Sequence, residues 1–147
     1  MMRSKKRAFT SFGATLLLIL GFVIFFQRTF RAVIVSGPSM LPTLRSGDRV
    51  WASSAYWLVG PIKQKDIVVF RDENSATGYL IKRVYFLPGD RVDFFNYPRN
   101  RSVLEQPFTI PPGYLYVIGD NRRVSEDSRE FGPIEMSRVI GKVVIRP

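Results

Sequence analysis

The chain of 147 residues contains no cysteine and no histidine. Without cysteine there can be no disulfide and no thiolate metal site, and with histidine also absent the two usual ligands of transition metals are missing. A Ser-His-Asp triad and a cysteine nucleophile are excluded for the same reason. If the protein carries out acyl transfer, a hydroxyl must be the nucleophile and Lys, Asp or Glu the base, which makes a Ser-Lys pair the natural candidate.

Acidic residues are absent from the first 31 positions, which hold six basic side chains: Arg3, Lys5, Lys6, Arg7, Arg28 and Arg31. The rest of the chain holds the other 16 basic groups and all 12 acidic ones. A nucleic-acid-binding protein concentrates its positive charge on the folded part or on an arm beside it. Here the charge brackets an apolar segment, so we expect no nucleic-acid partner.

That apolar segment, residues 8–27, is a run of 20 residues without a charge. As a helix it would be about 30 Å long, the thickness of a bilayer core. The excess of basic residues before it places residues 1–7 in the cytoplasm and residues 28–147 on the extracytoplasmic face of the cell membrane. A cleaved secretory signal peptide would share the basic start, but no small-x-small site follows Phe26. We therefore predict an uncleaved, single-pass transmembrane helix with the lipid bilayer as a partner.

After this segment, short β-prone runs alternate with Gly, Pro, Asp and Asn turn residues. The runs that predict strands are residues 31–35, 48–52, 67–70, 79–87, 92–95, 114–118 and 139–145. No helical period of useful length and no repeat is present. The spacing predicts a mostly β fold for residues 28–147, an antiparallel domain that is barrel-like or a sandwich.

Residues 51–62 are rich in aromatic side chains and carry no charge. One interpretation is a core strand followed by a hairpin. The other is an aromatic edge, including Trp57 and Leu58, that enters the interfacial layer of a membrane. The sequence leaves both open.

Lys82 lies in the predicted strand 79–87, where alternation places Leu80, Lys82 and Val84 on one face and Arg83 on the other. On an apolar face, desolvation disfavours the ammonium form and lowers the pKa of the amine. A shift from about 10.4 to about 7 corresponds to roughly 4–5 kcal/mol, which burial can supply, and it turns a lysine into a general base. Taken alone, a strand lysine more often packs its stem and extends its ammonium to water.

Ser39 lies in a turn-forming run, residues 36–44 (Ser-Gly-Pro-Ser-Met-Leu-Pro-Thr-Leu). Gly37 lets the main chain approach a substrate, and Pro38 fixes φ without donating a hydrogen bond. We expect the N–H of Ser39 to be an oxyanion donor beside its own hydroxyl, with Gly37 and Met40 as the adjacent substrate-approach positions. Composition alone would favour an ordinary polar β-turn.

A third run, residues 119–132, is a polar loop that follows the predicted strand 114–118. Such charge-rich loops are usually solvated surface. A carboxylate directly against Lys82 would raise the pKa of the lysine and spoil the base. We therefore expect Asp127 to be neutralised by an arginine such as Arg129, while a neutral hydroxyl such as Ser125 orients the amine.

Together, in this order and behind an apolar N-terminal segment, these runs resemble bacterial type I signal peptidases, the Ser-Lys serine proteases that cleave leader peptides. Residues 39–43 are similar to the family's nucleophile box, residues 81–90 to its lysine box, and residues 119–129 to its third box. The resemblance covers residues 30–145. Three boxes in order are a far more specific signal than one.

The resemblance implies a chemical role for three residues. Ser39 would attack the scissile carbonyl, Lys82 would act as general base and then protonate the leaving amine, and Ser125 would position Lys82. The implied substrates are secretory preproteins cut after small residues at −1 and −3, with no cofactor and no metal. The implied fold is a β-rich catalytic domain on a membrane anchor.

The resemblance also implies supporting residues in the third box. Asp127 and Arg129 would brace the loop as an ion pair, and Asp120 and Arg122 would give further support.

Two departures from the family pattern stand out. Some members carry a serine two positions before the nucleophile whose hydroxyl joins the oxyanion hole; here that position is Gly37, and Ser36 is one residue too early. The second oxyanion donor is therefore open. The segment between the second and third boxes, residues 92–113, is short, so any accessory β-domain must be minimal.

Two other classes of function remain alternatives. Self-cleaving repressors share the Ser-Lys pair, but they need an N-terminal DNA-binding domain, and residues 1–30 offer only an apolar segment. A non-enzymatic, membrane-anchored β-module would have Ser39 and Lys82 as unrelated turn and core residues. The oligomeric state and the preferred preproteins are not determined by the sequence.

Overall fold

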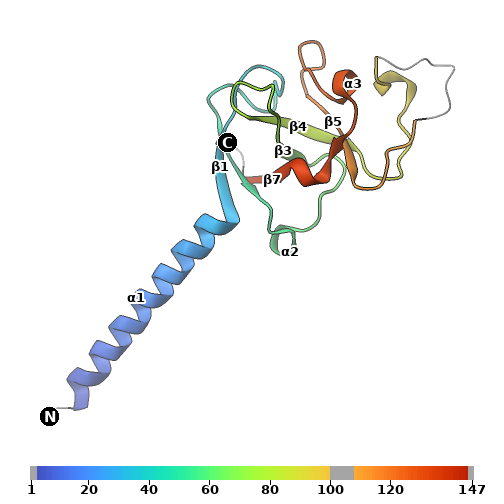
Figure 1. Ribbon diagram of the computed structural model, residues 1–147. Helices are drawn as coiled ribbons and strands as arrows, with labels where there is room; N and C mark the ends of the chain where they lie inside the picture. Colours follow the sequence, from blue (N-terminus) through green and yellow to red (C-terminus); the bar gives the residue numbers. More distant parts are fainter. Residues whose placement is uncertain (1–2, 100–107, 146–147) are drawn as a thin grey trace. The chain divides into compact units, whose positions relative to one another are not determined.

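The structure, a computed structural model, describes residues 3–99 and 108–145, and the side chains of the N-terminal helix only from Gly13 onward. The chain divides into two compact units, Met1–Arg31 and Ala32–Pro147. The first unit is almost entirely the helix α1, Arg3–Thr29 (Figure 1).

The structure does not support the predicted membrane anchor over residues 8–27. Within the described residues, no helix combines the length and the apolarity needed to cross a bilayer. The single-pass topology predicted from that segment is therefore unsupported as well.

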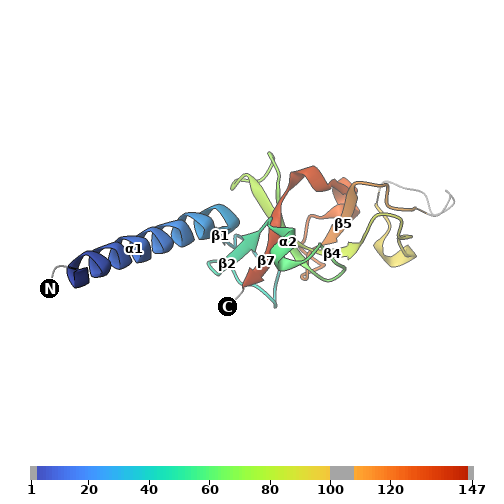
Figure 2. The same ribbon diagram turned by 90° about the horizontal axis from the view of Figure 1, so that it is seen from below.

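The strands of the described residues form one seven-stranded sheet. Its strands are β1 (Phe30–Ile34), β2 (Arg49–Ser53), β3 (Ile67–Arg71), β4 (Tyr79–Phe86), β5 (Tyr114–Ile118), β6 (Ile134–Glu135) and β7 (Val139–Ile145). Their spatial order is β1-β2-β7-β3-β4-β5-β6, and the pairs from β2 through β6 are antiparallel. Figure 2 shows β2 and β7 side by side. The prediction of a mostly antiparallel β domain is confirmed.

The sheet is covered on both faces, as the strand β3 shows. Ile67 and Val69 belong to one apolar cluster, while Val68 and Phe70 belong to another. All four side chains are 5% exposed or less. A strand buried on both faces reads as a continuous apolar run rather than an alternating one, which is the pattern of residues 67–70.

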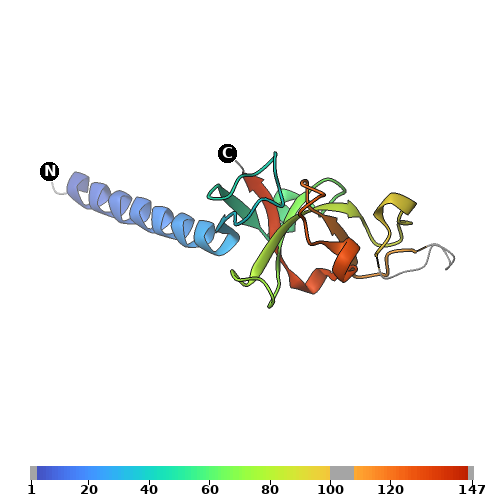
Figure 3. The same cartoon turned by 90° about the horizontal axis from the view of Figure 1, so that it is seen from above.

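The predicted strand at residues 92–95 is wrong. Phe94–Asn96 form a short 3-10 helix, η1, which is closed by the Asn96 amide donating to both carboxylate oxygens of Asp93 at 2.8 and 2.9 Å. This segment follows β4 and lies at the end of the second unit away from β2 (Figure 3). It belongs to the predicted insert of residues 92–113, of which 100–107 lie outside the described part.

Three further short elements complete the described fold: α2 (Tyr56–Val59), α3 (Ser128–Phe131) and η2 (Met136–Arg138). The helix α2 replaces the hairpin that one interpretation predicted within residues 51–62. Trp57 on α2 is 78% exposed and Leu58 is 50% exposed. The alternative interpretation, insertion of this edge into a membrane interface, stays a prediction.

Candidate active site

Ser39 is half-buried in the loop that connects β1 to β2. Gly37 has a φ of +83°, a backbone conformation that favours glycine, and its N–H donates to Ser46 Oγ at 3.3 Å. On the other side of Ser39, Met40 is 1% exposed and its carbonyl accepts the N–H of Leu44 at 2.9 Å. A buried methionine and a left-handed glycine therefore fix the loop on either side of the serine.

Lys82 lies on β4 and is only 2% exposed, so the burial inferred from strand alternation is confirmed. Its strand neighbours Leu80 and Val84 belong to the apolar cluster around Phe70. Burial is the main cause that lowers the pKa of the Lys82 amine below its ordinary value of 10.5. The Asp127 and Glu126 carboxylates oppose this shift, and the Arg129 guanidinium adds to it.

The loop between β5 and α3 is organised by the Asp127 carboxylate, which is fully buried. Arg129 donates to it from Nε and Nη2, both at 2.9 Å, and the Gly119 N–H donates at 3.0 Å. Burial alone would raise the pKa of Asp127, but these hydrogen bonds to its charged form hold the pKa below the usual value. The expected neutralisation of Asp127 by Arg129 is confirmed.

Ser125 lies inside this loop, 6% exposed, and its Oγ has no hydrogen-bond partner of ordinary geometry in the described residues. It nevertheless lies close enough to the Asp127 carboxylate for a hydrogen bond between the two groups to be one of the causes that lower the pKa of Asp127. Gly119 lies directly against it: a Cβ at position 119 would collide with Ser125 Oγ and would come within 2.6 Å of the Ser39 carbonyl oxygen. Ser39, Gly119 and Ser125 are therefore brought together.

Asp120 and Arg122 have separate partners. Arg83 forms a bidentate ion pair with the Asp120 carboxylate. Its Nε donates to Oδ1 at 2.7 Å and its Nη2 donates to Oδ2 at 2.6 Å. The Arg122 guanidinium contacts Asn96 Oδ1 and lies over the Tyr85 ring. Asp120 thus ties the third run to the lysine strand, while Arg122 ties it to the segment that contains η1.

Ser39 and Lys82 line the same cleft, a cavity of about 900 Å³ whose walls also include Gly37, Val124 and Glu126. Within the described part of the chain, Ser39 Oγ and Lys82 Nζ do not form a hydrogen bond with each other. Apo active sites often show such contacts as long or unformed, so this does not remove the pair as a catalytic candidate.

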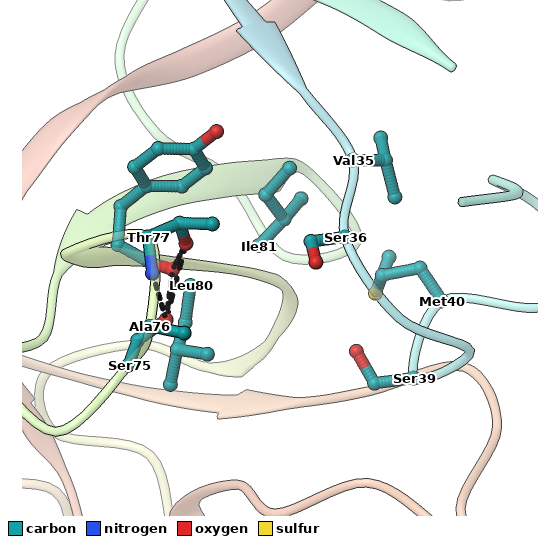
Figure 4. Close-up of a pocket in the computed structure, with 10 residues that line it drawn as sticks. Val35, Ser36, Ser39, Met40, Ser75, Ala76, Thr77, Leu80 and Ile81 are labelled. Atoms are coloured by element: carbon teal, nitrogen blue, oxygen red, sulfur yellow. Dashed lines mark hydrogen bonds between the residues drawn. The ribbon is translucent and has the colours of Figure 1, made fainter. Parts of the chain in front are cut away.

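A second, smaller cavity of about 80 Å³ adjoins Ser39. Figure 4 shows Ser36 and Ser39 on one side of it, with Leu80 and Ile81 and the turn of residues 75–77 across from them. Ser36 lines both cavities, which its position in the sequence relative to Ser39 does not reveal.

Among residues 3–99 and 108–145, no group of three or more acidic side chains is arranged to hold a metal ion.

Comparison with known proteins gives consistent matches. Residues 7–98 and 96–146 match the family model described as "Signal peptidase, peptidase S26". A protein named signal peptidase I from Bacillus caldolyticus is 34% identical, over 80% of this chain and 79% of its own length. A protein named mitochondrial ATP-independent inner membrane protease subunit 1a, from Arabidopsis thaliana, is 38% identical over 76% of this chain and 67% of its own.

Further matches include signal peptidase IB from Staphylococcus aureus, 31% identical over 76% of this chain and 74% of that protein. The crystal structure of a signal peptidase I from Enterococcus faecalis has a TM-score of 0.45 at 27% identity, covering 57% of this chain and 97% of that one.

Proposed function

The chain belongs to the signal peptidase family, peptidase S26, and we propose that it is a serine endopeptidase that removes N-terminal signal peptides from secretory preproteins, with Ser39 as nucleophile and Lys82 as general base. One observation carries the assignment of the base. Lys82 is 2% exposed, has a lowered pKa and lines the same cleft as Ser39. A lysine in that state is available as a base at a pH where a solvated lysine is a cation.

The proposed reaction begins when Ser39 Oγ attacks the carbonyl carbon of the scissile peptide and its proton passes to Lys82 Nζ. The tetrahedral intermediate collapses, the C–N bond breaks, and the Lys82 ammonium returns the proton to the leaving amine. Lys82 then takes a proton from water, whose oxygen attacks the acyl ester, and Ser39 is regenerated with that proton. The hydroxyl of Ser125 is buried and has no hydrogen-bond partner of ordinary geometry among the described residues, which supports a role in orienting Lys82 Nζ.

Two features support the proposed substrate class. The cavity of about 80 Å³ beside Ser39 suits small side chains next to the scissile bond. The larger cleft, of about 900 Å³, has room for an extended peptide that passes Ser39 and Lys82.

Incubation of the purified full-length chain in detergent with a preprotein that carries an Ala-x-Ala site tests the proposal. We expect the parent protein to cleave after the second alanine. We expect Ser39→Ala to lose at least about 10³-fold in kcat/KM, because the nucleophile is removed. We expect Lys82→Arg to lose activity too, because a guanidinium stays protonated and cannot accept the serine proton.

Two results would refute the proposal. A parent protein that leaves the preprotein intact would contradict the activity. Equal cleavage by the parent and by Lys82→Arg would contradict the neutral lysine base. Ser54→Ala is the matched control for the serine variant, since Ser54 is exposed and lies outside both cavities.

A further inference from the structure

The peptide bond between Pro38 and Ser39 has a particular importance in the proposed reaction. Its N–H belongs to Ser39, and in the described residues this N–H donates no hydrogen bond, so it is available to a developing oxyanion. A donor of this kind is effective only if it already points at the position where the negative charge forms. What holds this peptide plane in place therefore affects the transition state directly.

Asn121 contacts this peptide and the next one. Its side-chain Nδ2 donates to the Pro38 carbonyl at 3.3 Å, and its backbone N–H donates to the Ser39 carbonyl at 2.9 Å. The Pro38 carbonyl also accepts the Leu41 N–H at 3.1 Å, within the loop itself. Both carbonyl groups that flank the nucleophile are thus bound by one residue from a loop more than 80 positions further along the chain.

The same residue is connected to the second part of the site. The Asn121 carbonyl accepts the N–H groups of Val124 and Ser125 at 3.2 and 3.1 Å. This turn places the buried Ser125 hydroxyl beside Gly119, which in turn lies against the Ser39 carbonyl. Asn121 therefore links the backbone of the nucleophile loop to the hydroxyl proposed to orient Lys82.

We propose that Asn121 is a positioning residue whose side-chain amide fixes the Pro38–Ser39 peptide so that the Ser39 N–H faces the oxyanion of the tetrahedral intermediate. A carbonyl that accepts a hydrogen bond also polarises the N–H of the same peptide, which strengthens it as a donor. The inference rests on the proposed function, because it assigns a role within that reaction. It concerns only the side-chain bond, since the backbone bonds of Asn121 persist in any variant.

Substitution of the side chain separates this role from a purely structural one. We expect Asn121→Ala to lower kcat about tenfold, less than the 10²–10³-fold for removal of a whole oxyanion donor. We expect KM to change less than about twofold, because the bond acts on the transition state and not on substrate binding. Asn121→Asp keeps the size of the side chain but cannot donate to the Pro38 carbonyl, so its loss should be at least as large.

Three further measurements make the test specific. The midpoint of the pH profile should stay that of the parent in Asn121→Ala, because Lys82 is untouched. The affinity for a peptide boronate, whose adduct with Ser39 is tetrahedral, should fall with kcat, while the affinity for the product peptide should not. Gln64→Ala is the matched control: that amide also donates to a backbone carbonyl, Tyr85 O at 2.7 Å, but it lines neither cavity beside Ser39.

The outcomes distinguish the inference from the proposed function. An active parent that needs Ser39, together with an Asn121→Ala variant of unchanged kcat, overturns the inference alone. A loss in kcat accompanied by an equal rise in KM, a shifted pH midpoint or a lowered melting temperature also overturns it, because the residue would then be structural. A parent protein without peptidase activity overturns the proposed function and the inference with it.

Discussion

Two lysines flank the same residue of the central sheet and end in different environments. Val68 on β3 pairs with Lys82 on β4 and with Lys142 on β7. Directly opposed residues in neighbouring strands project to the same face, so both lysines start from matched positions. Lys142 Nζ forms an ion pair with Asp66 at 3.2 Å and donates to the Pro61 carbonyl at 3.2 Å. Lys82 has neither an ion pair nor a hydrogen bond within the described residues.

The comparison shows that the position in the sheet does not determine what a lysine can do. Both side chains are largely buried, but among the described residues only Lys142 has a carboxylate in contact. Of the two carboxylates that raise the pKa of Lys82, that of Asp127 has the larger effect. This carboxylate is already bound by Arg129 and by the Gly119 N–H. The arginine therefore keeps the carboxylate from pairing with the lysine, which is what a neutral amine base requires.

The largest expected difference comes from replacing each lysine by methionine. Lys82→Met should lose about 10²–10⁴-fold in kcat/KM, the usual contribution of a general base. The free energy of unfolding of this variant should rise. A buried lysine with a lowered pKa opposes folding at every pH at which the same lysine is protonated in the unfolded chain. Lys142→Met should keep most of the activity and lose about 1 kcal/mol or less, because Asp66 is partly exposed and can be solvated.

Peptidase assays and urea denaturation of the two variants give the result. Similar losses of activity from both substitutions would mean that the two lysines are equivalent parts of the fold, and the comparison would fail.

The second expected effect concerns the ion pair that shields Lys82. Arg129→Met leaves the fully buried Asp127 carboxylate without its guanidinium partner, which should destabilise the fold by about 3–5 kcal/mol. The freed negative charge should also raise the pKa of Lys82 and move the rise of activity to higher pH. Arg99→Met removes an exposed ion pair with Glu130 and should cost about 1 kcal/mol or less. Unfolding curves of equal midpoint for the two variants would contradict this account of Asp127.

The third expected effect is steric. Gly119→Ala places a methyl group against Ser125 Oγ and the Ser39 carbonyl, and overpacking of this kind destabilises by about 1–3 kcal/mol. Activity should fall with it, because the two hydroxyl-bearing segments are pushed apart. Gly21→Ala is the control, since an added methyl there meets no atom within 4 Å. Melting temperature and kcat/KM measure both effects, and a Gly119→Ala protein with parental values would show that the close approach is not needed.

The smallest expected effect concerns Glu126, an exposed residue that lines the cleft. Its carboxylate raises the pKa of Lys82. Glu126→Gln should therefore lower that pKa, and the rise of activity with pH should begin at a lower pH than in the parent. The pH dependence of kcat/KM, measured with chemistry rate-limiting, checks the direction. An unchanged profile would mean that Glu126 does not act on the base, and a shift to higher pH would contradict the expected direction.

Much of the site could be predicted from local sequence patterns. Strand alternation correctly predicts the burial of Lys82, because residues 79–86 form a strand through that position. The charge argument was sufficient to pair Asp127 with Arg129. The antiparallel β architecture followed from short apolar runs between turn residues, and each of those runs except residues 92–95 overlaps a strand.

The remaining features depend on contacts between distant segments, which local patterns do not contain. The link from Asn121 to the Ser39 loop joins residues more than 80 positions apart, and the Asp120–Arg83 pair joins residues 37 apart. The 3-10 helix at residues 94–96 is closed by one Asp93–Asn96 contact that overrides the β-forming tendency of Val92, Phe94 and Phe95. The position of Ser36 on both cavities likewise depends on the fold of the loop.

The central claim is that the pKa of the Lys82 amine is low enough for it to be neutral at a pH where a solvated lysine is a cation. An NMR titration of the full-length protein with isotope-labelled lysine side chains measures this directly, and the Lys82→Arg variant identifies the Lys82 signal among the six lysines. The account predicts that Lys82 titrates below the ordinary lysine pKa of 10.5. A Lys82 signal that titrates at that pKa or above it would contradict the account.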